Sequence, residues 1–137
     1  MALRANQIDY KNGFKKHFHT YKSMKSDVSD ASKQLILVYC IECGLKYLFM
    51  KKKCIYDIRS ANQPIQEILH SHDFQVLLKE LNVTEYRFPV IHTVYNECIT
   101  AKRYHEACRY VLLKNDEKLC TYNKELDKVA EWIDERI

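Results

Sequence analysis

A nearly uncharged run from Leu35 to Met50 constrains the fold of this chain more than any other feature. Among its sixteen residues, LILVYCIECGLKYLFM, only Glu42 and Lys46 are charged. A segment of this kind is either a membrane-spanning helix or a helix that is buried over most of its circumference. The run is shorter than the roughly 20 residues that a spanning helix needs, and its two charges lie near its middle. The sequence therefore predicts a buried helix in the centre of a globular domain.

The predicted central helix carries apolar residues along two lines, which indicates two neighbours. These neighbours are either two other helices, or a core on one side and a partner subunit on the other. Gly44 would allow a second backbone to approach closely, so homodimerisation through this helix is one hypothesis. Glu42 and Lys46 are spaced i, i+4 with the acid first, which favours an ion pair on the helix surface.

The remaining sequence predicts further helices and few turns. The chain of 137 residues is expected to form a single domain, and it contains only two glycines and two prolines, too few for an all-β or βαβ fold. Apolar periodicity predicts helices at about 3–24, 31–50, 65–69, 74–81, 90–104 with an extension to 113, and 122–136. Ser29 and its polar neighbours can cap the central helix, and Ser71 or Asp73 the helix at 74–81. We expect an all-α fold, a compact antiparallel bundle of four to five helices.

Cysteine and histidine patterns do not form a recognisable metal motif. Cys40 and Cys43 are spaced CxxC but lie inside the apolar run, and no second CxxC or spaced histidine pair completes a zinc site. His70 and His72 are interpreted as capping and loop-packing residues. We therefore expect no metal and no cofactor. The N-terminal residues 1–4 lead into a polar segment without a secretory signal, so free thiols in a cytoplasmic protein are expected.

Three pieces of the sequence, taken in order, resemble HEPN domains (higher eukaryotes and prokaryotes nucleotide-binding). The first is the helix core YCIECGLKYLFM, and the second is His72-Asp73 opening a leucine-rich helix. The third is Tyr104 followed by Arg109-Tyr110 and a C-terminal helix. The resemblance implies a helical bundle, often dimeric. It further implies either a ribonuclease or a noncatalytic companion of nucleotidyltransferases and other bacterial defence or toxin–antitoxin components.

Ribonuclease members of this family carry an arginine and a histidine four to six residues apart at a dimer cleft. Arg87 and His92 have that spacing, so the resemblance makes them the candidate catalytic pair. Histidine can accept the proton of an attacking 2′-hydroxyl near neutral pH, and arginine can hold the phosphate. However, Phe88 and Pro89 follow the arginine where the family has a polar residue. The alternative is a loop arginine and a histidine on the polar face of a helix.

A second group of residues is suited to nucleotide or RNA binding. Arg103, Arg109 and Tyr110 could hold phosphates and stack bases, although arginines six apart share a helical face only if the helix breaks. The alternative is that Arg109-Tyr110 is structural. Three functions remain open. The chain could be a noncatalytic module that binds nucleotide, RNA or a protein partner such as a nucleotidyltransferase, a metal-independent endoribonuclease, or a helical scaffold without a ligand. The net charge of +4 permits all three.

Overall fold

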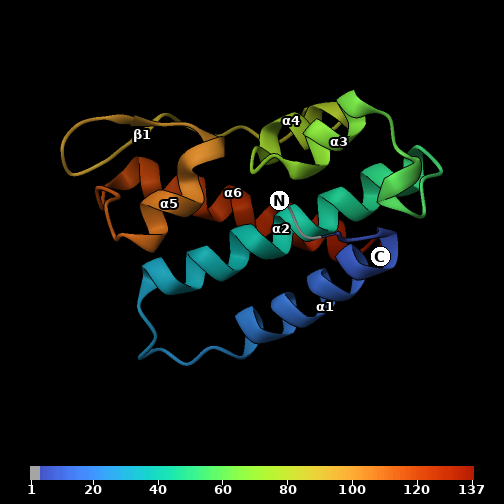
Figure 1. Ribbon diagram of the computed structural model, residues 1–137. Helices are drawn as coiled ribbons and strands as arrows, with labels where there is room; N and C mark the ends of the chain where they lie inside the picture. Colours follow the sequence, from blue (N-terminus) through green and yellow to red (C-terminus); the bar gives the residue numbers. More distant parts are fainter. Residues whose placement is uncertain (1–3) are drawn as a thin grey trace.

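Helix α2 (Asp30–Lys52) is the central element of the structure. The computed structural model describes residues 4–137. Helix α1 (Gln7–Ser23) runs antiparallel along one side of α2, and α4, α5 and α6 pack on its other sides (Figure 1). Asp9 accepts a hydrogen bond from the backbone N–H of Asn6 at 2.8 Å, which fixes the start of α1 at Gln7. Leu3, where the first helix was predicted to begin, lies outside the described residues.

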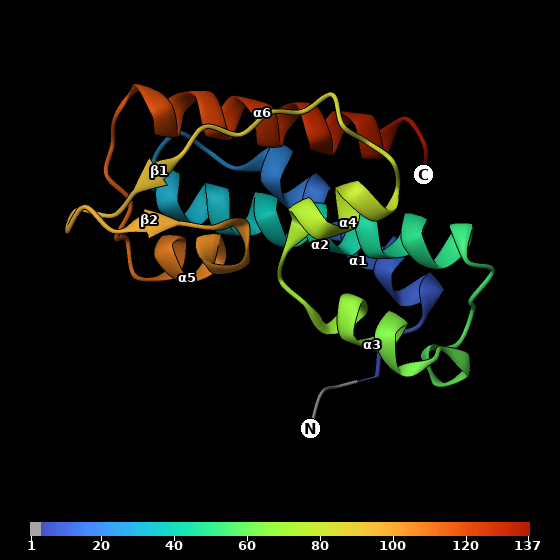
Figure 2. The same cartoon turned by 90° about the horizontal axis from the view of Figure 1, so that it is seen from above.

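The other elements follow α2 in a chain of short segments and one long final helix. They are η1 (Ile58–Ser60), α3 (Gln63–His70), α4 (Phe74–Glu80), β1 (Ile91–His92), β2 (Cys98–Ile99), η2 (Ala101–Arg103), α5 (Tyr104–Arg109) and α6 (Glu117–Asp134). Figure 2 shows α6 running alongside α2, with the hairpin and α5 at one end and η1 and α3 at the other. The predicted all-α class and compact bundle are confirmed. No helix among residues 4–137 is long and apolar enough to cross a membrane.

Polar side chains begin several of these helices as the sequence predicted. The side chain of Ser29 accepts a hydrogen bond from the Ser32 N–H at the start of α2. Asp73 accepts from the N–H groups of Gln75 and Val76 at 3.1 and 3.3 Å at the start of α4. These bonds pair backbone donors that a helix cannot satisfy itself.

The Gly44 contact is intramolecular, which corrects the expectation that this residue marks a dimer interface. A Cβ atom added to Gly44 would lie 2.5 Å from Cγ2 of Ile133 and 2.8 Å from Cδ2 of Phe14. At this point α2 is therefore covered by α1 and α6 of the same chain. The two-neighbour alternative is the one that the structure adopts.

The helix predicted over 90–104 is wrong, and its predicted extension to 113 is α-helical only over Tyr104–Arg109, in α5. Ile91 pairs with Ile99, and His92 with Cys98, in an antiparallel hairpin. The Oγ1 atom of Thr93 accepts hydrogen bonds from two backbone N–H groups in the turn, and β-branched residues favour extended backbone. In this part of the chain η2 and α5 are the helical segments, and α6 begins at Glu117 rather than at 122 because Asp116 caps it.

Candidate functional site

Five side chains from α2, α5 and the α3–α4 connection form the α2–α5 cluster. Its members are Tyr39, Glu42, His72, His105 and Arg109. Helix α5 packs directly on α2, which places its side chains beside the middle of the central helix. Asp73 ends the connection between α3 and α4 and caps α4. The residue before it, His72, reaches the Glu42 side chain on α2.

The centre of the cluster is a carboxylate held by a histidine. The Nδ1 atom of His72 lies 3.1 Å from Oε2 of Glu42 in a hydrogen bond. The rings of His72 and His105 lie with their centroids 4.3 Å apart. Glu42 is only 5% exposed, whereas the side chain of His72 is half exposed. The cluster therefore joins a buried acid to the protein surface through one imidazole.

Glu42 and Lys46 do not form the ion pair on the helix surface that their spacing favoured. Both residues are buried, with 5% and 7% of their surface exposed. The Nζ atom of Lys46 lies 5.7 Å from the centre of the Tyr10 ring, and the Glu42 carboxylate binds His72 instead. The expectation failed because α1 and the α3–α4 connection cover these positions, which helix spacing alone does not reveal.

Arg109 extends the cluster to the surface. Its Nη2 atom donates a hydrogen bond to the Tyr39 hydroxyl at 3.0 Å, while its side chain is exposed to solvent. His105 and Arg109 are four residues apart on α5, so they lie on one face of the helix. Tyr39 lies next to His105, with ring centroids 6.3 Å apart. The result is a continuous row from the buried Glu42 carboxylate to the exposed guanidinium.

The electrostatics of the cluster follow from burial. Burial raises the pKa of Glu42, against the hydrogen bond from His72 and the charge of Lys46, which lower it. Burial also lowers the pKa of His105, and the neighbouring His72 and Arg109 lower it further. The hydrogen bond to Tyr39 raises the pKa of Arg109, which therefore stays cationic. A fixed cation thus lies close to His105, whose protonated form is disfavoured by burial.

Of the residues predicted to bind nucleotide or RNA, the structure brings only Arg109 into this cluster. Arg103 is paired with Glu106 at 3.0 Å on the surface. Tyr110 follows α5 and is exposed. The helix breaks between the two arginines, where η2 changes to α5. Such a break would allow them to share a face, but Arg103 binds Glu106 and Arg109 binds Tyr39.

Arg87 and His92, the predicted catalytic pair, have different neighbours. Arg87 is exposed in the segment before the hairpin, and its backbone N–H donates to Oε2 of Glu125 on α6 at 3.1 Å. His92 lies in strand β1, not in the first turn of a helix, and its carbonyl accepts from the Lys114 N–H at 2.9 Å. Among the described residues, no hydrogen bond or cation–π contact joins the two side chains.

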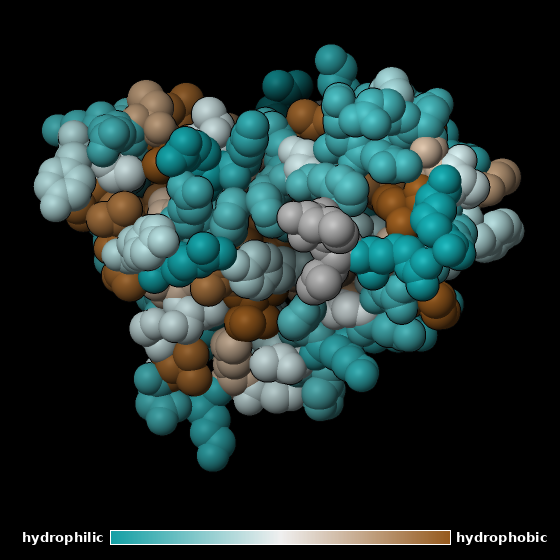
Figure 3. Space-filling view, viewed as in Figure 1, coloured by the Kyte–Doolittle hydropathy of each residue, from teal (hydrophilic) through white to brown (hydrophobic). Residues whose placement is uncertain are grey.

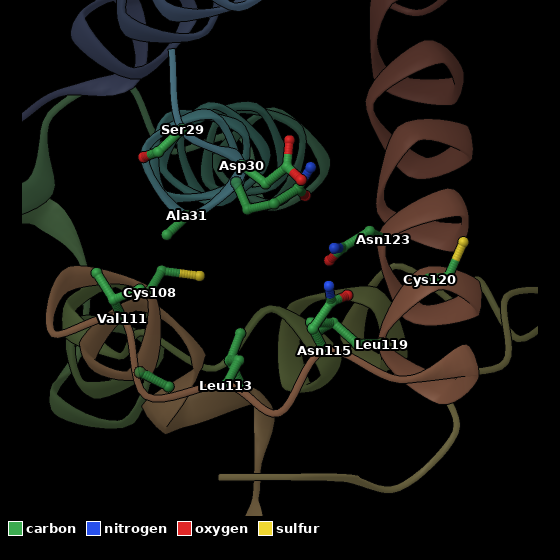
Figure 4. A pocket seen from close by; sticks show the side chains of 12 residues that line it. Ser29, Asp30, Ala31, Cys108, Val111, Leu113, Asn115, Leu119, Cys120 and Asn123 are labelled. Atoms are coloured by element: carbon green, nitrogen blue, oxygen red, sulfur yellow. The ribbon is translucent and has the colours of Figure 1, made fainter. Parts of the chain in front are cut away.

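A separate cavity of about 450 Å³ lies between the start of α2, the end of α5 and the start of α6. Figure 4 shows the Cys108 thiol and the Asn115 and Asn123 amides pointing into this space. The cavity is large enough for a small ligand. Asp30 is the single charged residue among those that line it, so the cavity disfavours an anion. The α2–α5 cluster is therefore the better candidate for a phosphate.

Exposed hydrophobic residues gather at the end of the molecule that carries the hairpin. We call the set Val94, Tyr95, Tyr110 and Val111 the hairpin-end surface. The Val94 N–H donates to the Leu112 carbonyl at 2.8 Å, which holds the hairpin turn against the segment after α5. Figure 3 shows hydrophobic residues over this end of the molecule.

Comparison with known proteins gave no relative. No protein-family model, no curated protein and no solved structure matches the chain.

Proposed function

We propose that this protein is a noncatalytic helical module, of the HEPN-like kind that its sequence resembles, and that it binds phosphate groups of RNA or of a nucleotide at the α2–α5 cluster. The observation that carries the proposal is the exposed Arg109 guanidinium, anchored at 3.0 Å by the Tyr39 hydroxyl. Arginine presents five N–H donors, so the bond to Tyr39 leaves donors free for a phosphate.

Separate neighbours for Arg87 and His92 support a noncatalytic role. In-line cleavage of RNA needs a proton acceptor and a phosphate-binding cation in one place. His92 lies in the hairpin, whereas Arg87 is tied by its backbone to α6. The α2–α5 cluster is the place in the described residues where a phosphate-binding arginine and histidines meet.

Binding is tested by fluorescence anisotropy with a labelled single-stranded RNA at fixed salt. We expect Arg109→Ala to weaken binding about tenfold or more, because a hydrogen bond to a charged group contributes about 1.5–3 kcal/mol. The matched control is Arg59→Ala, which removes an exposed arginine on η1 at the other end of the molecule. Competition by ATP or by unlabelled RNA distinguishes a nucleotide from RNA. Equal affinity in the two variants, or no saturable binding, would contradict the proposal and favour a scaffold without a ligand.

A second candidate is metal-independent RNA cleavage, favoured by the Glu42–His72 hydrogen bond. A carboxylate that orients an imidazole is a common arrangement for a general base. Incubation of the protein with labelled RNA in EDTA tests this function. Cleavage that is lost in His72→Ala and retained in His92→Ala would assign it to the α2–α5 cluster, and the reverse pattern would assign it to Arg87 and His92. The absence of cleavage supports the noncatalytic proposal.

We further propose that the protein is a homodimer formed through the hairpin-end surface. Tyr95 and Val111 are 74% and 70% exposed, and such clustered apolar exposure is typical of interfaces. Light scattering after gel filtration should give a dimer mass that Tyr95→Ser reduces. Ile8→Ser, an exposed apolar residue on α1, is the control that should leave the mass unchanged. A monomer mass for the wild type at high concentration would refute the dimer.

We also propose a cytoplasmic location. All six cysteines are free in the structure, three of them on the surface. Free surface thiols are typical of a reducing compartment. Fractionation of cells that express the protein, followed by immunoblotting, tests the location.

A further inference from the structure

Glu42, His72 and His105 bring three metal-binding groups together from three separate segments of the chain. One ligand atom of each residue lies within 4.8 Å of those of the other two. The Glu42 carboxylate comes from the middle of α2, one imidazole from the α3–α4 connection, and the other from the first turn of α5. The three residues are 30 or more positions apart in the sequence, so they do not form a recognisable metal-binding motif.

Two polar atoms in this group are buried and lack a hydrogen-bond partner among the described residues. They are Oε1 of Glu42 and Nδ1 of His105. Glu42 is 5% exposed and His105 is 7% exposed, so water has little access to either residue. A buried polar atom without a partner costs about 1–3 kcal/mol, and more when it is charged. The orphaned carboxylate oxygen is therefore unexplained by the protein alone.

We propose that Glu42, His72 and His105 form a binding site for a divalent transition-metal ion of the zinc type. Two imidazole nitrogens and one carboxylate oxygen suit zinc, cobalt or nickel, whereas magnesium and calcium prefer oxygen ligands alone. Three protein ligands leave a coordination position open for a water molecule or another oxygen ligand. A bound cation also neutralises the buried carboxylate.

The geometry requires only a small adjustment to hold such an ion. Zinc ligands lie about 2 Å from the metal, which places any two of them within about 4 Å of each other. The present separations of up to 4.8 Å close by side-chain rotation. The side chain of His72 is half exposed, so it has room to rotate and provides the path by which an ion enters.

This inference goes beyond phosphate binding and does not depend on it. The metal would lie at the buried end of the α2–α5 cluster, and Arg109 with Tyr39 would remain free at the exposed end. Loss of RNA binding therefore leaves the metal proposal intact, and the converse also holds.

Metal binding is tested by titrating EDTA-stripped protein with Zn²⁺ in a calorimeter and with Co²⁺ in a spectrophotometer. The background protein carries Cys54→Ser, Cys98→Ser and Cys120→Ser, which removes the exposed thiols that also bind these ions. We expect one ion per chain and visible Co²⁺ absorption without a thiolate charge-transfer band.

Variants of the cluster decide the site. His72→Ala should weaken binding by about 100-fold or more, because the loss of even an outer-sphere partner costs about 10–100-fold. Glu42→Gln keeps the side-chain volume and removes the charge, so it should weaken binding as well, with folding checked by circular dichroism. The control His70→Ala removes an exposed histidine at the end of α3 and should bind as the background does. Absence of saturable binding, or equal affinity in His72→Ala and His70→Ala, overturns the proposal.

Discussion

Gly44 of α2 and Ile133 of α6 approach so closely that a Cβ atom on Gly44 would lie 2.5 Å from Cγ2 of Ile133. Phe14 of α1 closes the same space from the other side. We therefore expect Gly44→Ala to lower the free energy of unfolding. Overpacking of a core costs about 1–3 kcal/mol, and the better helix propensity of alanine returns about 1 kcal/mol. The net loss, up to about 2 kcal/mol, is measured by urea denaturation.

Gly13→Ala is the matched control for this substitution. Its added Cβ atom would meet Sγ of Cys43 at 3.1 Å, and that single side chain can rotate away. We expect a stability within about 1 kcal/mol of the wild type, because the helix propensity gain offsets the contact. A Gly44→Ala protein as stable as Gly13→Ala would show that α2 and α6 do not pack as closely as described.

Local sequence signals predicted the three long helices, with the start of α2 close to its true position, but they did not predict the hairpin segment. Ser29 was predicted as one cap, and Ser71 or Asp73 as another, because a cap needs only a polar side chain next to an apolar periodicity. The apolar residues of the 90–104 segment have spacings that also fit a helix. A strand of two residues is too short to show the alternation of apolar and polar residues that predicts a strand. Its hairpin is held by the Val94–Leu112 bond, which joins positions far apart in sequence.

The six cysteines should divide into groups of different reactivity. Cys54, Cys98 and Cys120 are exposed, Cys43 is half-buried, and Cys40 and Cys108 are buried. Burial raises the pKa of the Cys108 thiol to about 11, which suppresses its thiolate at neutral pH. With Ellman's reagent we expect three thiols to react rapidly in the native protein. Six should react in denaturant, and rapid reaction of all six without denaturant would contradict the buried positions.

The sequence alone did not predict the α2–α5 cluster, because its residues come together only in the folded chain. Arg109 was identified from its aromatic neighbours, whereas Glu42 was assigned to the helix surface and His72 to loop packing. A glutamate within an apolar run was a signal of a buried charge that needs a partner. The partner, His72, lies 30 positions away in the sequence and could not be identified from helix periodicity.

Tyr122→Phe should leave the protein as stable as the wild type or stabilise it. The Tyr122 hydroxyl is buried and has no hydrogen-bond partner among the described residues. Removing an unpaired buried hydroxyl recovers its desolvation cost, about 1 kcal/mol. Thermal unfolding should therefore show an equal or higher melting temperature.

Tyr104→Phe is the contrasting variant. The Tyr104 hydroxyl donates to Oδ1 of Asn123 at 2.6 Å, so its removal leaves that acceptor unpaired. We expect a loss of about 1 kcal/mol. A Tyr122→Phe protein that is destabilised as much as Tyr104→Phe would show that the Tyr122 hydroxyl has a partner after all.

Buried tyrosines and thiols should make the protein unstable in alkali. Burial raises the pKa of Tyr10 to about 12 and that of Cys108 to about 11, and it raises the pKa of Tyr104 and Tyr122 strongly as well. The unfolded chain releases these protons near pH 8.5 for cysteine and about 10 for tyrosine. Above those values the native state binds more protons than the unfolded state, so the free energy of unfolding falls as pH rises.

These groups should not affect the free energy of unfolding below about pH 8. They should lower it progressively from about pH 9 to pH 12. A fully buried group that stays protonated only in the native state contributes a slope of about 1.4 kcal/mol per pH unit. Urea denaturation at successive pH values measures the decline, and tyrosinate absorbance follows the ionisation directly. Tyr122→Phe should reduce the slope above pH 10, because it removes one of the buried titrating groups. A slope that is the same in this variant and in the wild type would mean that Tyr122 ionises in the native protein.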